Sequence, residues 1–197
     1  METLQTVPVD EQLRTHLAGE AYNAALTLLT ETYMAPVFRY CLRMCQGQRA
    51  LAEEITQQVF EAACRSIGQF RSEASAKTWL FAIAHHQVLR ALARQRRQEV
   101  LQQQWSQTHP GQTECSTTPE DDVPSNADVA RLRAVLTQAA LTPVDRSLVL
   151  LRFGINVPQA LSVNEVATVL GLSRDMVYRR LKHSLAQLKK LLDQPES

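Results

Sequence analysis

Residues 50–97 read ALAEEITQQVFEAACRSIGQFRSEASAKTWLFAIAHHQVLRALARQRR, and this stretch decides the fold. Its first half carries apolar residues at four-residue steps: Ile55, Val59, Ala63 and Ile67. This spacing predicts an amphipathic helix, because residues four apart lie on one face. A second helix is expected from near Ser75, whose hydroxyl suits an N-cap, to about Arg97. Trp79 is expected on the inner side of that helix.

The polar face of the first helix carries carboxylates and amides but no Lys or Arg. Its members fall at i, i+3, i+4 and i+7: Glu54, Gln57, Gln58 and Glu61. Such a face suits a basic protein surface, because carboxylates and amides pair well with arginine. The second helix carries Arg90, Arg94 and Arg97 on one face, and an arginine stripe neutralises phosphates. A merely solvated face is the alternative for both helices.

Composition places the chain among globular, all-α proteins. Of its 197 residues, 45% are hydrophobic and only 6 are glycine. The net charge of +1 argues against an indiscriminate nucleic-acid binder, but the charge is segregated. Residues 99–128 hold six acidic and no basic side chains, whereas residues 129–197 hold ten basic and five acidic ones. No apolar run approaches the twenty residues of a membrane span, and no signal peptide is apparent, so a cytoplasmic location without membrane insertion is expected.

The pattern along the chain predicts two small helical domains joined by a flexible acidic linker. Residues 1–19 show weak periodicity and are expected to form a disordered lead-in. A helical domain is expected over residues 20–98, with Pro36 kinking or dividing its first long helix. Residues 99–127 are expected to form the linker, and residues 128–197 the second domain.

The second domain contains the spacing of a helix-turn-helix. Ser162-x-x-Glu165 is a capping box that opens a short helix, Gly171 supplies the turn, and Ser173 caps the following helix. Val177, Leu181, Leu185 and Leu188 are expected to point inward. The outward face of the second helix is basic: Arg174, Tyr178, Arg179, Lys182 and His183. A helix with such a face is of the kind that enters the major groove of DNA, and an ordinary helical hairpin is the alternative.

These motifs resemble a known family. Glu54-Ile-Thr-Gln57-Gln-Val-Phe60 resembles the signature of bacterial RNA polymerase sigma factors, and residues 70–84 resemble the segment after that signature in the extracytoplasmic-function (ECF) branch. Residues 141–192 are similar to the C-terminal DNA-reading domain of that branch. The resemblance implies a protein that is not an enzyme and needs no cofactor. It would bind core RNA polymerase and direct transcription initiation at specific promoters, and an anti-sigma partner is also implied.

The resemblance also implies roles for individual residues. Glu54, Gln57 and Gln58 match positions that grip the β′ clamp helices, and the β subunit is a further expected contact. The melted −10 strand, with one base flipped into a pocket at residues 70–76, is expected to meet Phe70, Arg71, Ser75, Lys77, His86, Arg90 and Arg94. The −35 duplex is expected to meet Arg174, Tyr178, Arg179, Lys182 and His183. His86 stands where relatives often have Asn, Arg90 where Asp is common, and residues 153–161 form a loop about four residues longer than usual.

Two alternatives stay open. The chain could be a stand-alone helix-turn-helix regulator, which binds duplex DNA without polymerase. It could instead be a small enzyme dependent on a metal or a thiol, using Cys41, Cys45, Cys64 and His85. Neither a CxxC motif nor a His-pair spacing supports that second alternative, so buried or free thiols are favoured, Cys115 included.

Overall fold

The structure is a computed structural model that describes residues 8–108, 141–155 and 160–192, without the side chains of residues 102–108 and 192. The described part is helical throughout and contains no strand, as predicted. Its elements are α1 (Val9–Ala18), α2 (Tyr22–Met44), α3 (Arg49–Ser66), the 3₁₀ turn η1 (Ile67–Gln69), α4 (Ala76–Thr108), α6 (Pro143–Phe153), α7 (Val163–Leu170) and α8 (Arg174–Leu192).

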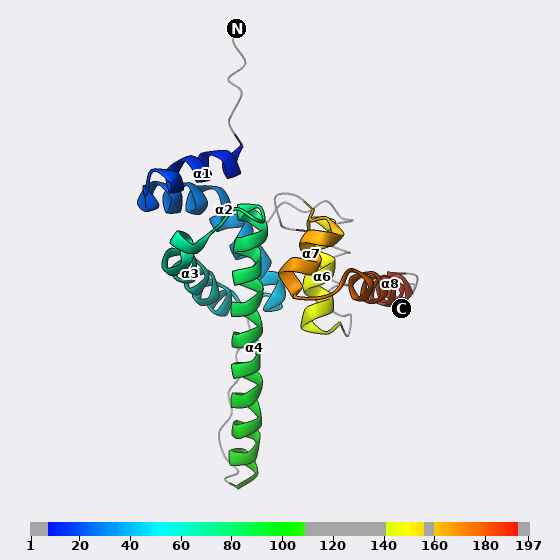
Figure 1. Ribbon diagram of the computed structural model, residues 1–197. Coiled ribbons are helices and arrows are strands. Elements are labelled where there is room, and N and C mark those ends of the chain that lie inside the picture. Colours follow the sequence, from blue (N-terminus) through cyan, green and yellow to red (C-terminus); the bar gives the residue numbers. More distant parts are fainter. Residues whose placement is uncertain (1–7, 109–140, 156–159, 193–197) are drawn as a thin grey trace.

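Helix α4 is the axis of the molecule. Helices α1–α3 lie on one side of it and α6–α8 on the other, and its C-terminal half projects beyond both groups (Figure 1). α7 packs against α4, and α6 against α2, so the two groups share a junction. The predicted apolar stripes face inward: Leu29, Val37 and Cys41 of α2 and Ile55 and Val59 of α3 are fully buried. Pro36 lies within α2 but does not divide it.

The predicted lead-in is wrong for residues 9–18, which form α1. Leu13 is fully buried, and the Asp10 carboxylate accepts a hydrogen bond from the backbone N–H of Ala76 at 2.7 Å. That N–H belongs to the first turn of α4, where backbone donors have no partner within the helix. α1 is therefore held by contacts with a segment far away in the sequence, which weak local periodicity does not reveal.

The predicted helix end near Arg97 is also wrong, because α4 continues to Thr108. Residues 98–108 carry Gln, Glu and Leu, which favour helix, and no Gly or Pro. The first ten residues of the predicted linker are thus helical. Its remainder, residues 109–127, and the helix predicted from Asp128 lie outside the described residues.

Asp10→Ala should test the contact between α1 and α4. The variant leaves the Ala76 N–H without its acceptor, and loss of a capping acceptor costs about 1 kcal/mol. We expect the free energy of unfolding to fall by that amount in a urea titration monitored by circular dichroism. Glu11→Ala is the matched control, because Glu11 lies in the same first turn of α1 but is exposed. An equal loss of unfolding free energy in both variants would show that the hydrogen bond between Asp10 and the Ala76 N–H does not stabilise the fold.

Side-chain caps fix the ends of the C-terminal helices. The Thr142 hydroxyl accepts from the Asp145 N–H at the start of α6, which has Pro143 in its first turn. α7 opens with the predicted capping box between Ser162 and Glu165, and Gly171 ends it with φ 63°. Ser173 Oγ then accepts from the Met176 N–H at 3.3 Å and so caps α8.

The packing of α8 differs from the prediction at one residue. Val177 and Leu188 are buried and Leu181 is half-buried, but Leu185 is 40% exposed. Ser184 takes the buried position beside it, and its hydroxyl bonds the Arg180 carbonyl one turn earlier at 2.9 Å. A small side chain therefore meets the core where the periodicity predicted a large one.

Candidate interaction surfaces

The outward face of α3 is acidic and organised by its own hydrogen bonds. Glu54, Gln57 and Glu61 are exposed, and Gln58 is half-buried. The Gln58 amide donates to Glu54 Oε1 at 2.8 Å, and the Gln57 amide donates to Glu61 Oε1 at 2.9 Å. These bonds orient the carboxylates while leaving oxygen lone pairs open to a partner. The structure thus places all the predicted polar residues of α3 on one accessible surface.

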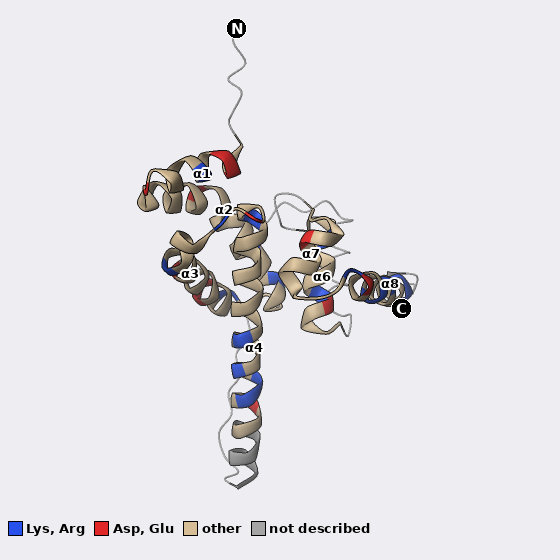
Figure 2. Cartoon of the chain, in the orientation of Figure 1, with Lys and Arg blue, Asp and Glu red and all other residues tan. Residues whose placement is uncertain are grey.

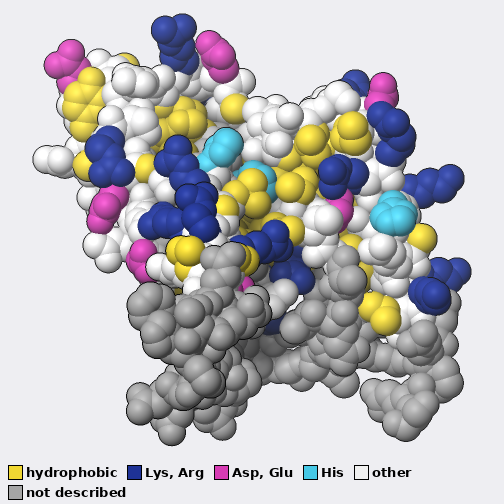
Figure 3. All heavy atoms as spheres, turned by 90° about the horizontal axis from the view of Figure 1, so that it is seen from below, with side chains coloured by type: hydrophobic (Ala, Val, Ile, Leu, Met, Phe, Trp, Pro, Cys, Tyr) yellow, Lys and Arg dark blue, Asp and Glu magenta, His cyan; other side chains and the backbone are white. Residues whose placement is uncertain are grey.

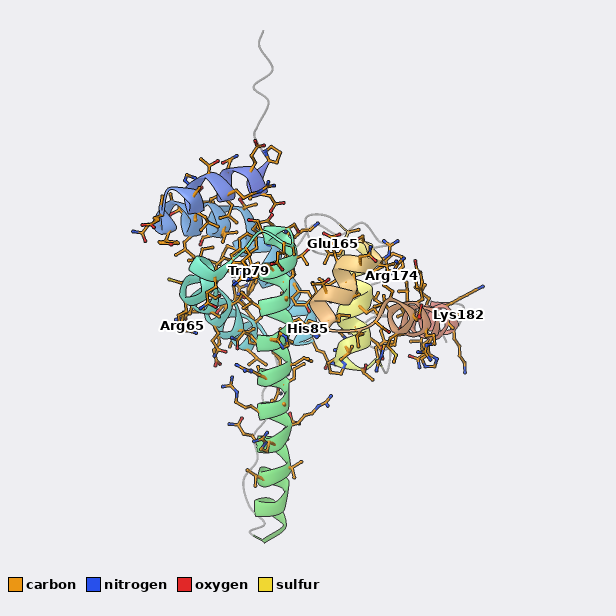
Figure 4. All side chains as sticks on the ribbon, viewed as in Figure 1. Arg65, Trp79, His85, Glu165, Arg174 and Lys182 are labelled. Carbon is orange, nitrogen blue, oxygen red and sulfur yellow. The ribbon has the colours of Figure 1, made fainter. Side chains whose placement is uncertain are left out.

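The segment before α4 forms an aromatic corner. The rings of Phe70 and Trp79 pack with centroids 5.0 Å apart and planes tilted by 46°. Both side chains are half-buried against the core, so Trp79 is a core residue that stays partly accessible. Figure 4 labels Trp79 on the side of α4 that faces α3. Ser75 Oγ accepts from the Thr78 N–H at 3.1 Å, which confirms the predicted cap of α4. Stacking on aromatic side chains is a common way to hold an unpaired base.

The remaining residues of the predicted −10 set lie farther along α4. His86, Arg90 and Arg94 recur at four-residue steps, and all three are exposed. Figure 2 shows basic residues along this part of the helix. At 1.5 Å rise per residue, Lys77 and Arg94 are roughly 26 Å apart along the helix axis. The predicted set is therefore an extended track rather than one pocket.

The outward face of α8 gathers the predicted duplex-binding residues. Arg174, Tyr178, Arg179, Lys182 and His183 are all exposed, Tyr178 by 53%. Arg174 and Lys182 project away from the other helices (Figure 4). The structure thus brings all five together on one basic surface.

A single ion pair fixes how α8 lies on α6 in the described part of the chain. Arg180, on the opposite side of α8 from the basic surface, donates to the Asp145 carboxylate at 2.8 Å. That carboxylate also accepts from the Thr142 hydroxyl at 2.5 Å. This ion pair therefore adds to the apolar packing of Val177 and Leu188 in holding α8, and it also involves the cap of α6.

A buried polar network joins the two groups of helices, and the sequence analysis did not find it. Tyr40 of α2, His85 of α4 and Ser147 of α6 are all at least 98% buried. The Tyr40 and Ser147 hydroxyl oxygens are 2.5 Å apart, and they lie 3.3 and 3.1 Å from His85 Nδ1.

Burial lowers the pKa of His85 to about 4, with a further contribution from neighbouring His86. The imidazole is therefore neutral at pH 7, and its tautomer sets whether Nδ1 donates to or accepts from these hydroxyl groups. One sequence signal could have revealed this network: Tyr40, His85 and Ser147 are polar residues within otherwise apolar helix stripes.

A second polar contact crosses the junction at the start of α4. The Thr78 hydroxyl donates to Glu165 Oε1 at 3.1 Å, while Glu165 Oε2 accepts from the Ser162 N–H in the capping box. Burial alone would raise the pKa of Glu165. Its hydrogen bonds from Ser162 and Thr78 and the charge of Lys77 outweigh burial and lower it. Glu165 is thus ionised, and its charge acts on Lys77, one of the predicted −10 residues.

The cysteines show no arrangement for catalysis in the part of the chain that is described. Cys41 and Cys45 are buried free thiols, and burial raises the pKa of each to about 12. A thiol that stays protonated is a poor nucleophile and metal ligand. Cys64 is free and exposed, and Cys115 lies outside the described residues. Within the described ranges, no three His, Cys, Asp or Glu side chains converge as metal ligands, and no helix has the length and apolarity to cross a membrane.

Comparisons with known proteins find sigma factors. Residues 29–98 match the family model for sigma-70 region 2. The chain is 27% identical over 165 residues to RNA polymerase sigma factor YlaC of Bacillus subtilis (strain 168), covering 82% of this chain and 88% of that protein.

Two solved structures share the fold. CnrH, in complex with the cytosolic domain of CnrY, aligns with a TM-score of 0.64 at 23% identity over 94% of this chain and 98% of its own. The sigma factor RpoE of Bartonella quintana, in complex with the anti-sigma factor NepR, aligns with a TM-score of 0.63 and 18% identity, and the alignment covers 85% of this chain and 96% of RpoE.

Proposed function

Because this chain is a sigma-70 region 2 sigma factor of the ECF type, which directs transcription initiation, we propose that α3 docks it on core RNA polymerase. The observation that carries this proposal is the α3 face, where Glu54, Gln57 and Gln58 present oriented acceptors and the one flanking arginine, Arg65, is paired with Glu61 at 4.0 Å. An arginine-bearing helix pair, such as the β′ clamp helices, is the complementary surface. The β subunit is proposed as a further contact.

We propose that the aromatic corner and the basic track of α4 together hold the melted −10 strand. Phe70, Arg71, Ser75 and Lys77 surround the corner, which offers a surface for one extruded base. His86, Arg90 and Arg94 continue along α4 toward its C-terminal half, where they would follow the phosphates. Extruding a base costs a few kcal/mol of stacking, and binding to this surface offsets that cost. Promoter melting is thus driven by binding energy and needs no cofactor.

For the C-terminal part we propose a helix-turn-helix domain that reads the −35 duplex through α8. The five exposed residues from Arg174 to His183 support this role, because they form one outward basic face on a helix with a capped N-terminus. Residues 9–108, which comprise α1 to α4, and residues 128–197 then act as two domains joined by an acidic connector. An anti-sigma factor is a further proposed partner, as in the two solved complexes, and the cytoplasm is the proposed location.

Binding both promoter elements requires the junction to open. Elements about 25 base pairs apart are separated by roughly 85 Å of duplex at 3.4 Å per base pair. A compact chain of this length has a radius of gyration of roughly 16 Å and so spans only about half that distance. The packing of α7 on α4 therefore belongs to the unbound chain, and we propose that docking on polymerase separates the two groups of helices.

Arg179→Ala tests the role of α8. We expect weaker binding to −35 duplex and a salt slope, log Kobs against log salt concentration, reduced by about one if Arg179 neutralises one phosphate. Fluorescence anisotropy with labelled promoter DNA measures both. Arg65→Ala is the control, because Arg65 is an exposed arginine on α3. An unchanged slope in Arg179→Ala would remove this residue from the DNA contacts.

The second candidate function is a stand-alone regulator that binds duplex DNA without polymerase. It requires the basic face of α8 but gives no role to the acidic face of α3. Run-off transcription from a library of genomic promoters, with core polymerase and this protein, separates the two. Transcripts that appear only with both components support the sigma role.

A further inference from the structure

A cavity of about 230 Å³ lies where α6 meets the end of α2 and the middle of α4. It does not overlap the acidic face of α3 or the basic face of α8. Apolar side chains such as Met44 and Leu92 contribute to its wall. Its polar lining comes from both sides of the junction: Gln46, Gln48, Gln95, Arg96, Glu99 and Arg146.

Arg146 is the unusual residue in this lining. It is only 7% exposed, and no carboxylate among the described residues lies within ion-pairing distance of it. With the Gln46 amide oxygen facing the guanidinium, that oxygen accepts from both terminal nitrogens at 2.9 and 3.0 Å, while Nε has no partner. Arg180, in contrast, has the Asp145 carboxylate at 2.8 Å.

A buried guanidinium without a counter-charge calls for an anion. Burial lowers the pKa of Arg146, but arginine stays charged in proteins. Buried charges are ordinarily paired, because desolvation of an isolated ion is costly. Neutral Gln46 provides hydrogen bonds without cancelling the charge, so among the described residues the guanidinium of Arg146 has no counter-charge.

The other lining groups define the size and type of the missing anion. Arg96 adds a second cation from α4, and Figure 3 shows Lys and Arg side chains gathered on this side of the molecule. Glu99, the one carboxylate in the described lining, accepts from the Gln95 amide at 3.2 Å and keeps its charge, so the two arginines leave the described lining with a net positive charge. The volume lies below the 300–1,000 Å³ typical of cofactor pockets, so it fits a small oxyanion. Guanidinium forks match the oxygens of phosphate.

We propose that this cavity binds a phosphate group, held by Arg146 of α6 and Arg96 of α4. The group is either free phosphate or the terminal phosphate of a larger metabolite. Because its ligands come from both sides of the junction, the bound anion opposes the separation of α6 from α2 and α4. Occupancy would therefore stabilise the packed form of the chain.

Isothermal titration of the full chain with inorganic phosphate, in chloride buffer of matched ionic strength, tests the site. We expect saturable binding with one site per chain. Arg146→Gln should weaken it at least tenfold and Arg96→Gln several-fold. Arg39→Gln is the control, because Arg39 is an exposed arginine on α2 that does not line the cavity, and this variant should bind as the parent does.

Circular dichroism of each variant shows that it is folded, and Arg96→Gln tests the site independently, because Arg96 is exposed. A parallel titration with AMP distinguishes the two sources. Equal binding of AMP supports a phosphate carried by a larger molecule, whereas binding of phosphate alone supports the free ion. The absence of saturable phosphate binding, or identical affinities for the parent and both cavity variants, would overturn the proposal.

Discussion

Glu54→Arg combined with Gln57→Ala is expected to abolish binding to core RNA polymerase. The double variant replaces an oriented carboxylate by a cation and removes a neighbouring amide from the same face of α3. A cation placed against a basic partner costs several kcal/mol, and each 1.4 kcal/mol is a factor of ten in affinity. We therefore expect a loss of at least about 100-fold in a pull-down with purified core enzyme.

The fold should survive this change. Both side chains are exposed, and their hydrogen bonds join neighbouring turns of one helix. Surface substitutions of this kind usually change the free energy of unfolding by less than about 0.5 kcal/mol. Glu31→Arg is the charge-matched control, because Glu31 is an exposed carboxylate on α2 and not on α3. Retained polymerase binding by the double variant, or equal loss in the control, would contradict the assigned docking face.

Acidification should destabilise the packed chain through His85. The pKa of His85 is lowered by burial from 6.5 to about 4, so the unfolded chain binds more protons than the folded one between these values. The contribution of His85 to stability is complete above about pH 6.5 and is lost as the pH falls toward 4. Between pH 7 and about pH 4.5 the loss should be on the order of 2–3 kcal/mol.

The structural cause of this loss lies at the junction. A protonated imidazole carries hydrogens on both ring nitrogens, so Nδ1 can then only donate to the Tyr40 and Ser147 hydroxyl oxygens. Its charge would also be buried among α2, α4 and α6 without a carboxylate in the network. Opening of the junction relieves both costs, so acid is expected to separate the two groups of helices.

Urea unfolding at the two pH values measures the effect. His85→Leu removes the titrating group and leaves Tyr40 bonded to Ser147, so its loss on acidification should be smaller than that of the parent. His86→Gln is the control, because His86 is the adjacent residue but is exposed, and its loss should resemble the parent's. Equal acid sensitivity in parent and His85→Leu would exclude His85 as the origin.

Local patterns predicted most of the helical core correctly. The four-residue steps of Ile55 and Val59 describe one face of a helix whatever lies opposite, and both residues are buried. The capping box of Ser162 and Glu165 involves two residues three apart, so the chain contains the whole signal. In the same way, the exposure of the five basic-face residues of α8 follows from the burial of Val177 and Leu188 on its other side.

The wrong predictions concern segments whose state depends on something other than an apolar stripe. Residues 9–18 are helical because Leu13 and Asp10 find partners in other elements. α4 runs to Thr108 because residues with high helix propensity extend an already nucleated helix, at little cost, beyond the core. In both cases the loss of periodicity was interpreted as the loss of structure.

The sequence by itself determined the helices, their caps, the acidic face of α3 and the basic face of α8, because spacing along a helix is a local property. Only the tertiary structure decided which polar groups meet across the junction: Tyr40 with His85 and Ser147, Thr78 with Glu165, and Arg146 with Gln46. In the network around Tyr40, the paired residues lie 45 to 107 positions apart in the sequence. Their meeting depends on how α6 and α7 pack against α2 and α4, and no spacing along the chain encodes that packing.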